Sequence, residues 1–451
     1  MTDFFEDNAD GTNLRLSRRE LLVKGGVAAG ALGAGSLLAQ RALAAQASVG
    51  EASQLTIRHL GYGVDQLAAI EAAAEKKLNY KFNFTIKDLP SVAQLLVTSP
   101  GQWDVASPDQ YQVPQILPAD VIQPIDTRRI PEWRNVVPLF KTGKMSASCT
   151  FGQGDAAYRM LPIDPKDPRR LTGGTPFQAS LRNKVPQSRY IFGLPNVYNV
   201  DSFGYNRKVF GRPATTWAEL VNPRWKGRIG IINDPASGPQ ELALALQSAG
   251  KLKVRNLGNM SRAEIDNLTK MTIDLKKQGY FRALWSTFEE SASLMAAGEV
   301  VIESMWQPAQ TILLEQGHDV GYAAPKEGYL GWCIFLAIPK HVKGEKLDAV
   351  YDYLNWWLSG VPGAIVARQG YYSPVPKNVR KYLSKAEWDY WYGGKPAATV
   401  LVGPSGKRLL PKGTLREGGS FARRVCKYAF WQTVMPETQY MTQRWNDFVS
   451  A

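Results

Sequence analysis

Residues 54–87 read QLTIRHLGYGVDQLAAIEAAAEKKLNYKFNFTIK and change periodicity twice. Polar and apolar residues alternate over residues 54–60 and again over 80–87, as they do in strands. Between these segments, residues 66–78 place apolar side chains at helical spacing, namely Leu67, Ile70, Ala74 and Leu78. A strand–helix–strand order predicts a parallel or mixed sheet covered by helices, which is the α/β class.

Segments with strand-like and helix-like periodicity continue to alternate along the chain. Further strands are expected at residues 189–195, 228–235, 298–304 and 331–339. Helices are expected at residues 239–247 and 347–358, and a closing helical region at 420–449. The strand at 228–235 ends in a polar turn, and ligand sites in open α/β sheets lie at such carboxyl ends.

Residues 150–188 interrupt the pattern with five prolines, several glycines and several basic side chains. We expect this segment to be a long surface insertion.

Composition sets further limits. The 451 residues are 44% hydrophobic and 21% charged, which supplies a core and excludes a chain dominated by disorder. The three cysteines, Cys149, Cys333 and Cys426, allow at most one disulfide and leave one thiol. The three histidines are far apart and show no metal-ligand spacing, and no cofactor motif is present. After residue 50, no apolar run approaches the roughly 18 to 20 residues that span a bilayer.

The first 47 residues have the three-part layout of an export signal. SRRELLVK at residues 17–24 precedes a Gly/Ala segment at 25–39, ALA at 42–44 offers a cleavage site, and AQA at 45–47 offers another. Paired arginines before a weakly hydrophobic stretch resemble a twin-arginine signal, which predicts use of the Tat translocase, removal of residues 1–47 and a periplasmic protein. A membrane anchor is the alternative interpretation. Export disfavours a nucleic-acid partner despite the net charge of +14.

Short motifs then follow one another in order. They are WDV at 103–105, SPDQY at 107–111, VIQPID at 121–126, TWAEL at 216–220, PRWKGR at 223–228, GEV at 298–300, MW at 305–306, PKEG at 325–328, LAIP at 336–339 and GYYSPVP at 370–376. In this order they resemble the spermidine/putrescine-binding family of periplasmic solute-binding proteins, over most of residues 54–378.

This resemblance implies an α/β type II periplasmic binding fold with two lobes and two crossover strands at the hinge, near residues 200–206 and 321–332. Lobe 1 would comprise residues 53–199 and 332–378, including the insertion at 150–188. Lobe 2 would comprise residues 200–331 and 379–451.

The function implied is that of the substrate-binding component of an ABC importer. It would capture a polyamine or a related amine-containing small solute between its lobes and present the closed form to the permease. Such a protein is no enzyme, needs no cofactor and is expected to be a monomer.

Amine recognition requires carboxylates for ammonium groups and aromatic faces for methylene and cation–π contacts. By resemblance, Asp234 corresponds to a carboxylate that anchors an amine, and Asp109 stands where the family has a small polar residue. The aromatic candidates are Tyr111, Trp306, Trp332 and Tyr371, and the candidates around the first hinge strand are Tyr198 and Asp201.

Two positions depart from the family pattern. Ser237 and Ile334 stand where the family has carboxylates. Isoleucine cannot hold an ammonium group, and a buried cation without a partner is costly. A linear polyamine is therefore disfavoured relative to an amino-acid-like, opine-like or other solute with one amine and an acidic or neutral end.

Each candidate also has a purely structural interpretation, since Asp109 and Asp234 suit caps, Asp201 suits a solvated surface, and the aromatic residues suit core or loop packing. Two alternative functions use the same fold. A thiaminase-like enzyme would use Cys333 as nucleophile, although its neighbours offer nothing to lower the pKa of the thiol. A ferric-ion-binding protein would use Tyr371 and Tyr372. A membrane-surface role is the third alternative, although no strongly amphipathic basic helix is present.

Overall fold

The computed structural model describes residues 54–451 except 155, 165 and 173–187. The expected export signal at residues 1–47 lies outside this range. Contacts group Leu55–Ala451 into one unit, which is described here by itself. Within it, the helices are too short or too polar to cross a membrane.

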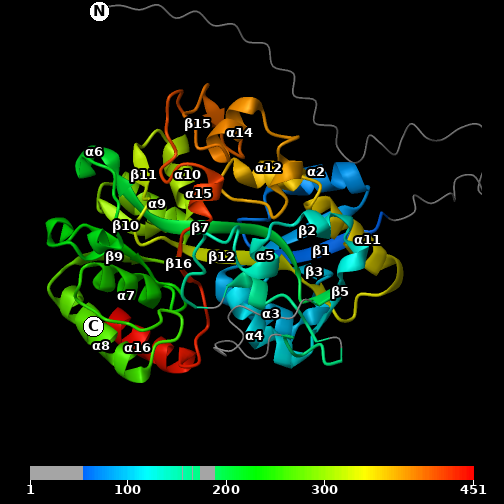
Figure 1. The fold of residues 1–451 in the computed structure, drawn as a ribbon, viewed down its shortest axis with the longest axis horizontal. Helices are drawn as coiled ribbons and strands as arrows, with labels where there is room; N and C mark the ends of the chain where they lie inside the picture. Colours follow the sequence, from blue (N-terminus) through cyan, green and yellow to red (C-terminus); the bar gives the residue numbers. More distant parts are fainter. Residues whose placement is uncertain (1–53, 155, 165, 173–187) are drawn as a thin grey trace, which may run out of the picture. The chain divides into compact units, whose positions relative to one another are not determined.

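A three-stranded sheet forms from the first part of this unit. Its order is β2 (Lys81–Ile86), β1 (Thr56–Gly61), β3 (Val105–Ala106), and all three strands are parallel. The helices that pack against it include α2 (Ala68–Leu78), α3 (Leu89–Thr98) and α11 (Gly344–Trp357). The strand–helix–strand prediction is thereby confirmed, because the alternating segments pair in parallel across α2 (Figure 1).

A seven-stranded mixed sheet forms the other half. Its order is β16 (Tyr428–Trp431), β12 (Tyr329–Leu336), β7 (Leu194–Asn206), β10 (Ile302–Met305), β8 (Ile229–Ile232) and β9 (Phe281–Trp285), with β11 (Val320–Tyr322) also paired to β7. Its helices are α7 (Gly238–Ser248), α8 (Arg262–Lys277), α9 (Phe288–Ala296), α10 (Gln307–Glu315) and α16 (Thr438–Ser450).

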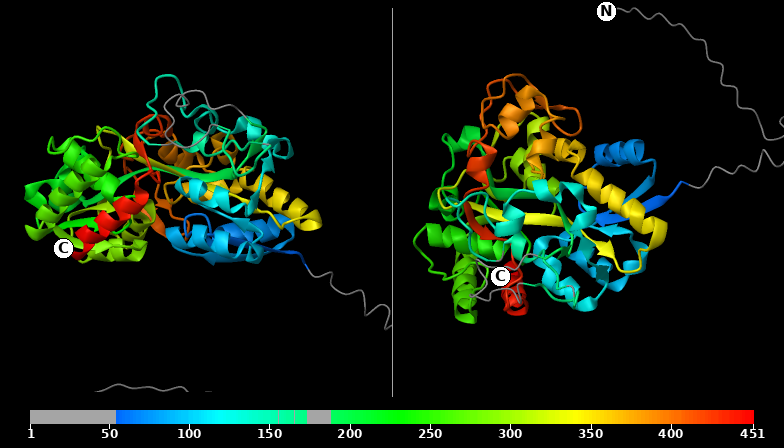
Figure 2. Two further views of the ribbon diagram at one scale, coloured as in Figure 1. Left: turned by 90° about the horizontal axis from the view of Figure 1, so that it is seen from below. Right: turned by 45° about the vertical axis from the view of Figure 1, so that its right-hand side comes forward.

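Strands β7 and β12 connect the two halves. β7 pairs with β10 and β11 at its carboxyl end and with β12 along residues 194–201. Just beyond β12, Ala337 bridges to Ala106 of β3, so this pair of strands reaches the first sheet. Both long strands run through the middle of the unit in Figures 1 and 2. The first expected crossover, at 200–206, lies within β7, whereas the second, expected near 321–332, lies later in the chain at β12.

The remaining elements are short. They are α4 (Val113–Ile116), β4 (Ile122–Gln123), β5 (Ile125–Asp126), α5 (Leu139–Thr142), β6 (Tyr190–Ile191), α6 (Arg207–Phe210), β13 (Ile338–Pro339), α12 (Val361–Ala367), α13 (Pro376–Val379), α14 (Lys385–Trp391), β14 (Leu401–Val402), β15 (Arg408–Leu410) and α15 (Phe421–Arg424), together with several single 3-10 turns.

The expectation of a closing helical region at 420–449 is wrong in its middle. Residues 428–431 form β16, which runs parallel to β12 and buries Tyr428, Phe430 and Trp431. Aromatic side chains fit a sheet well, and here a neighbouring strand edge was available to pair with them. Only α15 and α16, on either side, are helical.

The expectation of a surface insertion is wrong for the described part of residues 150–163. Ala157, Tyr158, Met160 and Leu161 are buried in the core, each at most 3% exposed. The amide of Phe192 donates to the carbonyl of Leu161, so this segment packs beside β6. Prolines signalled irregular backbone correctly, but irregular backbone can still be buried when its polar groups find partners.

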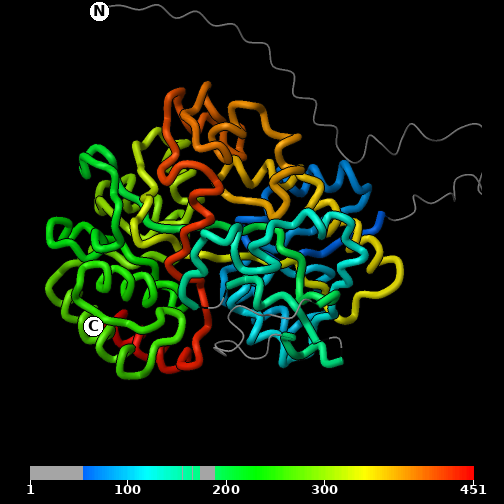
Figure 3. The backbone as a smooth tube through the Cα atoms, in the orientation of Figure 1, coloured from blue at the N-terminus to red at the C-terminus, as the bar shows by residue number. Residues whose placement is uncertain are grey.

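One disulfide joins Cys149 to Cys426, which are 277 residues apart in sequence. The third cysteine, Cys333, is a buried free thiol on β12. In Figure 3 the segment after Cys149 and the red segment around Cys426 run side by side near the centre of the unit.

Candidate functional site

A cavity of about 730 Å³ is lined by residues from both sheets. Its wall includes turns that directly follow the carboxyl ends of parallel strands. These are residues 62–64 after β1, 87–90 after β2, 233–235 after β8, 286–289 after β9, and Trp306 after β10. The cavity thus occupies the location at which α/β sheets place ligands.

Three carboxylates that are buried or half-buried line this cavity: Asp109, Asp201 and Asp234. Asp109 and Asp201 are each 3% exposed. Asp234 is half-buried as a residue, but its Oδ2 is shielded from solvent and makes no hydrogen bond within the described chain. Burial raises the pKa of all three, because the charged form loses its hydration.

Asp201 has the most complete set of donors. The indole nitrogen Nε1 of Trp332 donates to its Oδ2 at 2.5 Å, and Nδ2 of Asn199 donates to its Oδ1 at 2.7 Å. Arg424, whose guanidinium donates to the carbonyl of Val200 at 3.2 Å, also favours the charged form. Burial outweighs these groups and raises the pKa of Asp201 to about 6.

Asp109 and Asp234 serve as caps while they line the cavity. Oδ1 of Asp109 accepts from the amide of Tyr111 at 3.3 Å in a capping box with Gln112. Oδ1 of Asp234 accepts from the amide of Ala236 at 3.2 Å in the turn before α7. The structural and the ligand-facing interpretations are therefore compatible for Asp234, whose Oδ2 makes no hydrogen bond within the described chain.

Aromatic rings cover two parts of the wall. Trp332 and Tyr371 meet edge to face, with ring centroids 5.2 Å apart. Trp306 meets Phe288 in the same manner at 5.7 Å. Tyr62 also lines the cavity. Such faces suit the methylene groups of a solute and cation–π contact with an ammonium group.

The cavity wall is acidic, whereas the chain as a whole carries a net positive charge. Of the described lining residues, Lys87 alone is basic, whereas five are acidic: Asp88, Asp109, Asp201, Asp234 and Glu289. Lys87, Asp88 and Glu289 are exposed. Behind the wall, Glu241 of α7 is 2% exposed, and its pKa is raised by burial and by the charges of Asp234 and Asp201. A protein of net charge +14 thus has an acidic cavity.

Six of the eight residues expected at the site line the cavity, and two do not. Tyr198 lies three residues before Asp201 on β7, so the two side chains project from opposite faces of the strand. The ring of Tyr198 packs edge to face against Phe140 at 5.1 Å instead. Tyr111 is buried beside the wall, close enough to Asp234 for that charge to raise its pKa further, after the larger effect of burial.

The same alternation argues against the two alternative functions. Cys333 is the register partner of Tyr198 and lies between the two cavity residues of β12, Trp332 and Ile334, so it faces away from the cavity. Burial raises the pKa of its thiol, which opposes a nucleophilic role. Tyr372 likewise projects away, against Phe421 at 4.7 Å, and does not converge with Tyr371.

The two departures from the family pattern occupy different environments. Ile334 lines the cavity and forms a β-bridge with Asp109, which places a carboxylate-bearing residue directly beside it. Ser237 does not line the cavity, and its hydroxyl accepts from Nε2 of Gln432 at 2.8 Å.

Sequence reasoning missed Tyr62, Phe288, Glu289 and Gln432 as lining residues. Tyr62 could have been predicted from the sequence, because it directly follows the first strand. The turn at 286–289 follows a strand, β9, that the periodicity did not predict. Gln432 follows β16, which was expected to be helical.

Comparisons with known proteins agree with this architecture. A family model described as "Bacterial extracellular solute-binding protein" matches residues 68–391. The chain is 24% identical over 225 residues to the spermidine/putrescine-binding periplasmic protein of Escherichia coli, a match that spans 49% of this chain and 60% of that relative. It is 21% identical over 316 residues to the Salmonella typhimurium protein of the same name, over 66% of this chain and 75% of the relative.

Solved structures show the same fold. The spermidine/putrescine ABC transporter substrate-binding protein PotD from Streptococcus pneumoniae superimposes with a TM-score of 0.56 at 14% identity, over 88% of this chain and 99% of that one. A binding protein from A. tumefaciens in complex with agropinic acid superimposes with a TM-score of 0.53 at 16% identity, over 88% and 99%.

Proposed function

This chain belongs to the bacterial extracellular solute-binding protein family, and on that premise we propose that it captures a cationic, amine-bearing small solute in the acidic cavity. The family binds solutes and is not a family of enzymes. As part of the same proposal, the protein works in the periplasm as the monomeric binding component of an ABC importer, after export by the Tat translocase.

The observation that carries the proposal is the set of carboxylates in the cavity. Asp109 and Asp201 are removed from water, Asp234 is half-buried with a shielded Oδ2, and no basic side chain of the described wall pairs with them. A buried carboxylate without a cation either takes up a proton or loses stability. A solute ammonium group would supply the missing charge and hydrogen-bond donors.

The walls refine the solute class. Trp332 and Tyr371 stand beside Asp201, so an ammonium group bound there would also meet aromatic faces. The rest of the wall includes Val64, Leu89, Ile232 and Ile334, which suit a hydrocarbon body. Polyamines fit the names of the curated relatives, whereas Ile334 favours a solute with a single strongly held amine.

We also propose the motion that closes the site. The three-stranded sheet with its helices and the larger sheet with its helices would form the two lobes, with β7 and β12 as the hinge. The proposed boundaries remain 53–199 with 332–378 for lobe 1, and 200–331 with 379–451 for lobe 2. Closure would exclude water and strengthen every charged contact with the solute.

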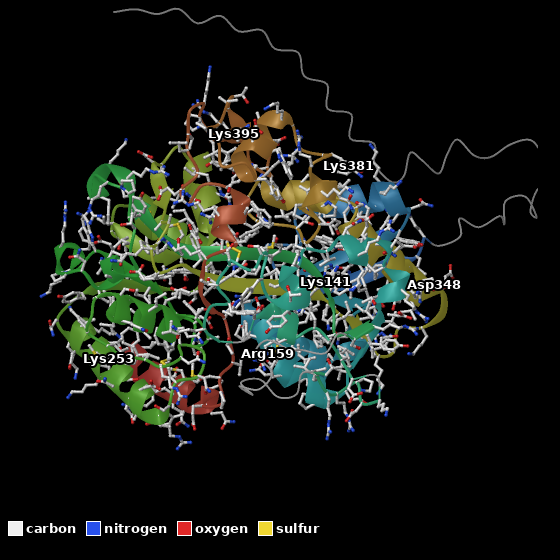
Figure 4. The ribbon with its side chains drawn as sticks, in the orientation of Figure 1. Lys141, Arg159, Lys253, Asp348, Lys381 and Lys395 are labelled. Carbon is white, nitrogen blue, oxygen red and sulfur yellow. A yellow bond between two sulfur atoms is a disulfide. The ribbon has the colours of Figure 1, made fainter. Side chains whose placement is uncertain are left out.

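A thermal-shift screen tests this function. The panel contains putrescine, spermidine, an amino acid, an opine, an uncharged sugar and ferric ion. A binder at one hundred times its dissociation constant stabilises by about 2.7 kcal/mol. We expect amines alone to stabilise the protein, and we expect Asp234→Asn to abolish the shift. Asp348→Asn is the matched control, because Asp348 projects from the periphery (Figure 4). A shift from the sugar or ferric ion only, or an unchanged shift in the Asp234 variant, refutes the proposal.

A further inference from the structure

Residues Cys149–Gly154, here called the strap, extend the large sheet beyond its outermost strand. The amide of Gln153 donates to the carbonyl of Ala429 at 2.8 Å, and the amide of Trp431 donates back to the carbonyl of Gln153 at 2.8 Å. The disulfide to Cys426 fixes the start of the strap just before β16. The strap is thus attached to β16 by backbone pairing and by a covalent bond.

The end of the strap contacts a loop that belongs to the larger sheet. The amide of Gly154 donates to Oδ1 of Asn256 at 3.1 Å, and the amide of Leu257 donates to Oε1 of Gln153 at 2.7 Å. A Cβ atom on Gly258 would lie 2.4 Å from Cα of Gly154, so the two backbones are in direct contact. This loop connects α7 to α8, which cover the larger sheet.

Both flanks of the strap return to the other half. On one side, α5 contributes Leu139 and Phe140 to the core, and the amide of Val137 donates to the carbonyl of Pro374 at 2.9 Å. On the other side, Leu161 and Ile163 bond to the backbone around β6. The chain therefore leaves the first half, contacts the second, and comes back.

Gln432 carries this connection to the cavity wall. It follows β16 directly and lines the cavity. Its side chain donates to Ser237 beside α7, and its carbonyl accepts from Nε2 of Gln110, next to Asp109, at 3.2 Å. One residue thus touches both sides of the cavity, and the strap holds the strand that carries it.

We propose that the strap and its disulfide form a third connection between the two halves, which limits how far the cavity opens. This rests on the proposed function, because it presumes that the halves move about β7 and β12. Opening could follow two routes. It would have to separate the Asn256–Gly258 loop from the strap, or move β16 and Gln432 away from the rest of the cavity wall. The disulfide opposes the second route, because it ties β16 to a segment whose flanks are embedded in the first half.

Small-angle X-ray scattering of the solute-free protein tests whether the strap limits opening, and it requires no knowledge of the ligand. The oxidised full chain is compared with Cys149→Ser/Cys426→Ser, which removes the covalent bond. It is also compared with Gln153→Ala/Asn256→Ala, which removes both side-chain hydrogen bonds between strap and loop. Lys253→Ala/Asn259→Ala is the matched control, because both side chains are exposed on the same loop and Lys253 projects outward in Figure 4.

We expect a larger radius of gyration in both strap variants and an unchanged one in the control. If the disulfide variant fails to fold, as its Kratky plot would show, the Gln153/Asn256 variant decides alone. Scattering curves that superimpose on the wild type for every folded strap variant overturn the proposal, as does equal expansion in the control. A failure of amine binding in the thermal-shift screen would instead overturn the proposed function and leave these curves unaffected.

Discussion

Asp201→Asn is expected to remove a pH-dependent loss of stability from the solute-free protein. The carboxyl group of Asp201 has a pKa of about 6 in the folded chain, against an ordinary value of 3.8. The folded state therefore binds more protons than the unfolded state between these values, and the free energy of unfolding falls as pH rises through this window. A difference of about two pKa units corresponds to about 3 kcal/mol.

The assay is urea unfolding at a series of pH values from about 4 to about 7.5, for the wild type and the Asp201→Asn variant. Asparagine can still accept one of the hydrogen bonds that Trp332 and Asn199 donate, so the variant has a loss of hydrogen bonding that is present at every pH. That loss does not depend on pH. The informative quantity is the difference in unfolding free energy between variant and wild type, which should rise by about 2.4 kcal/mol over the series.

Asp109 and Asp234 titrate in both proteins and largely cancel in this difference. A flat line for Asp201→Asn would mean that its carboxyl group is solvated in the solute-free state. A cationic solute would then have no desolvated carboxylate at Asp201 to compensate.

Three further predictions follow from the same contacts. In titration calorimetry, the affinity for an amine should rise as pH increases through about 6, because the ammonium group needs an ionised Asp201, and a pH-independent affinity would contradict this. Trp332→Phe should keep the fold, as circular dichroism would show, but weaken amine binding by about 1.5 to 3 kcal/mol, because it removes the indole donor to the carboxylate of Asp201. An unchanged dissociation constant would argue against a role for this hydrogen bond in binding. Cys149→Ser/Cys426→Ser should lower the free energy of unfolding by about 2 to 5 kcal/mol in urea melts. As a check within the same experiment, iodoacetamide should leave the buried thiol of Cys333 unmodified until the chain unfolds.

Local periodicity was sufficient to predict much of the fold. The segments at 54–60, 66–78 and 80–87 became β1, α2 and β2, because alternation and helical spacing record which face each element buries. Residues 428–431 were missed because a four-residue aromatic run carries no period of its own, and pairing with distant β12 decides its structure. Burial at 157–161 depends on partners remote in sequence in the same way.

The sequence predicted most of the residues of the candidate site, but not the side of its strand from which each side chain projects. Asp109, Asp201, Asp234, Trp306 and Trp332 reach the cavity as expected. Tyr198 does not, because its position three residues before Asp201 on β7 reverses its direction. That contradiction was visible in the sequence once both residues were assigned to one strand, since strand side chains alternate.

The placement of the cavity wall on turns has a consequence for how such a molecule can be altered. Lys87 and Ser286 contact the cavity from the connections that follow β2 and β9, and both are exposed. Substitutions at these two positions change the chemistry presented to a bound molecule at small cost in stability. Such positions lend themselves to altered ligand preference, and to laboratory conversion of the protein into a sensor, by substitution of a few exposed residues.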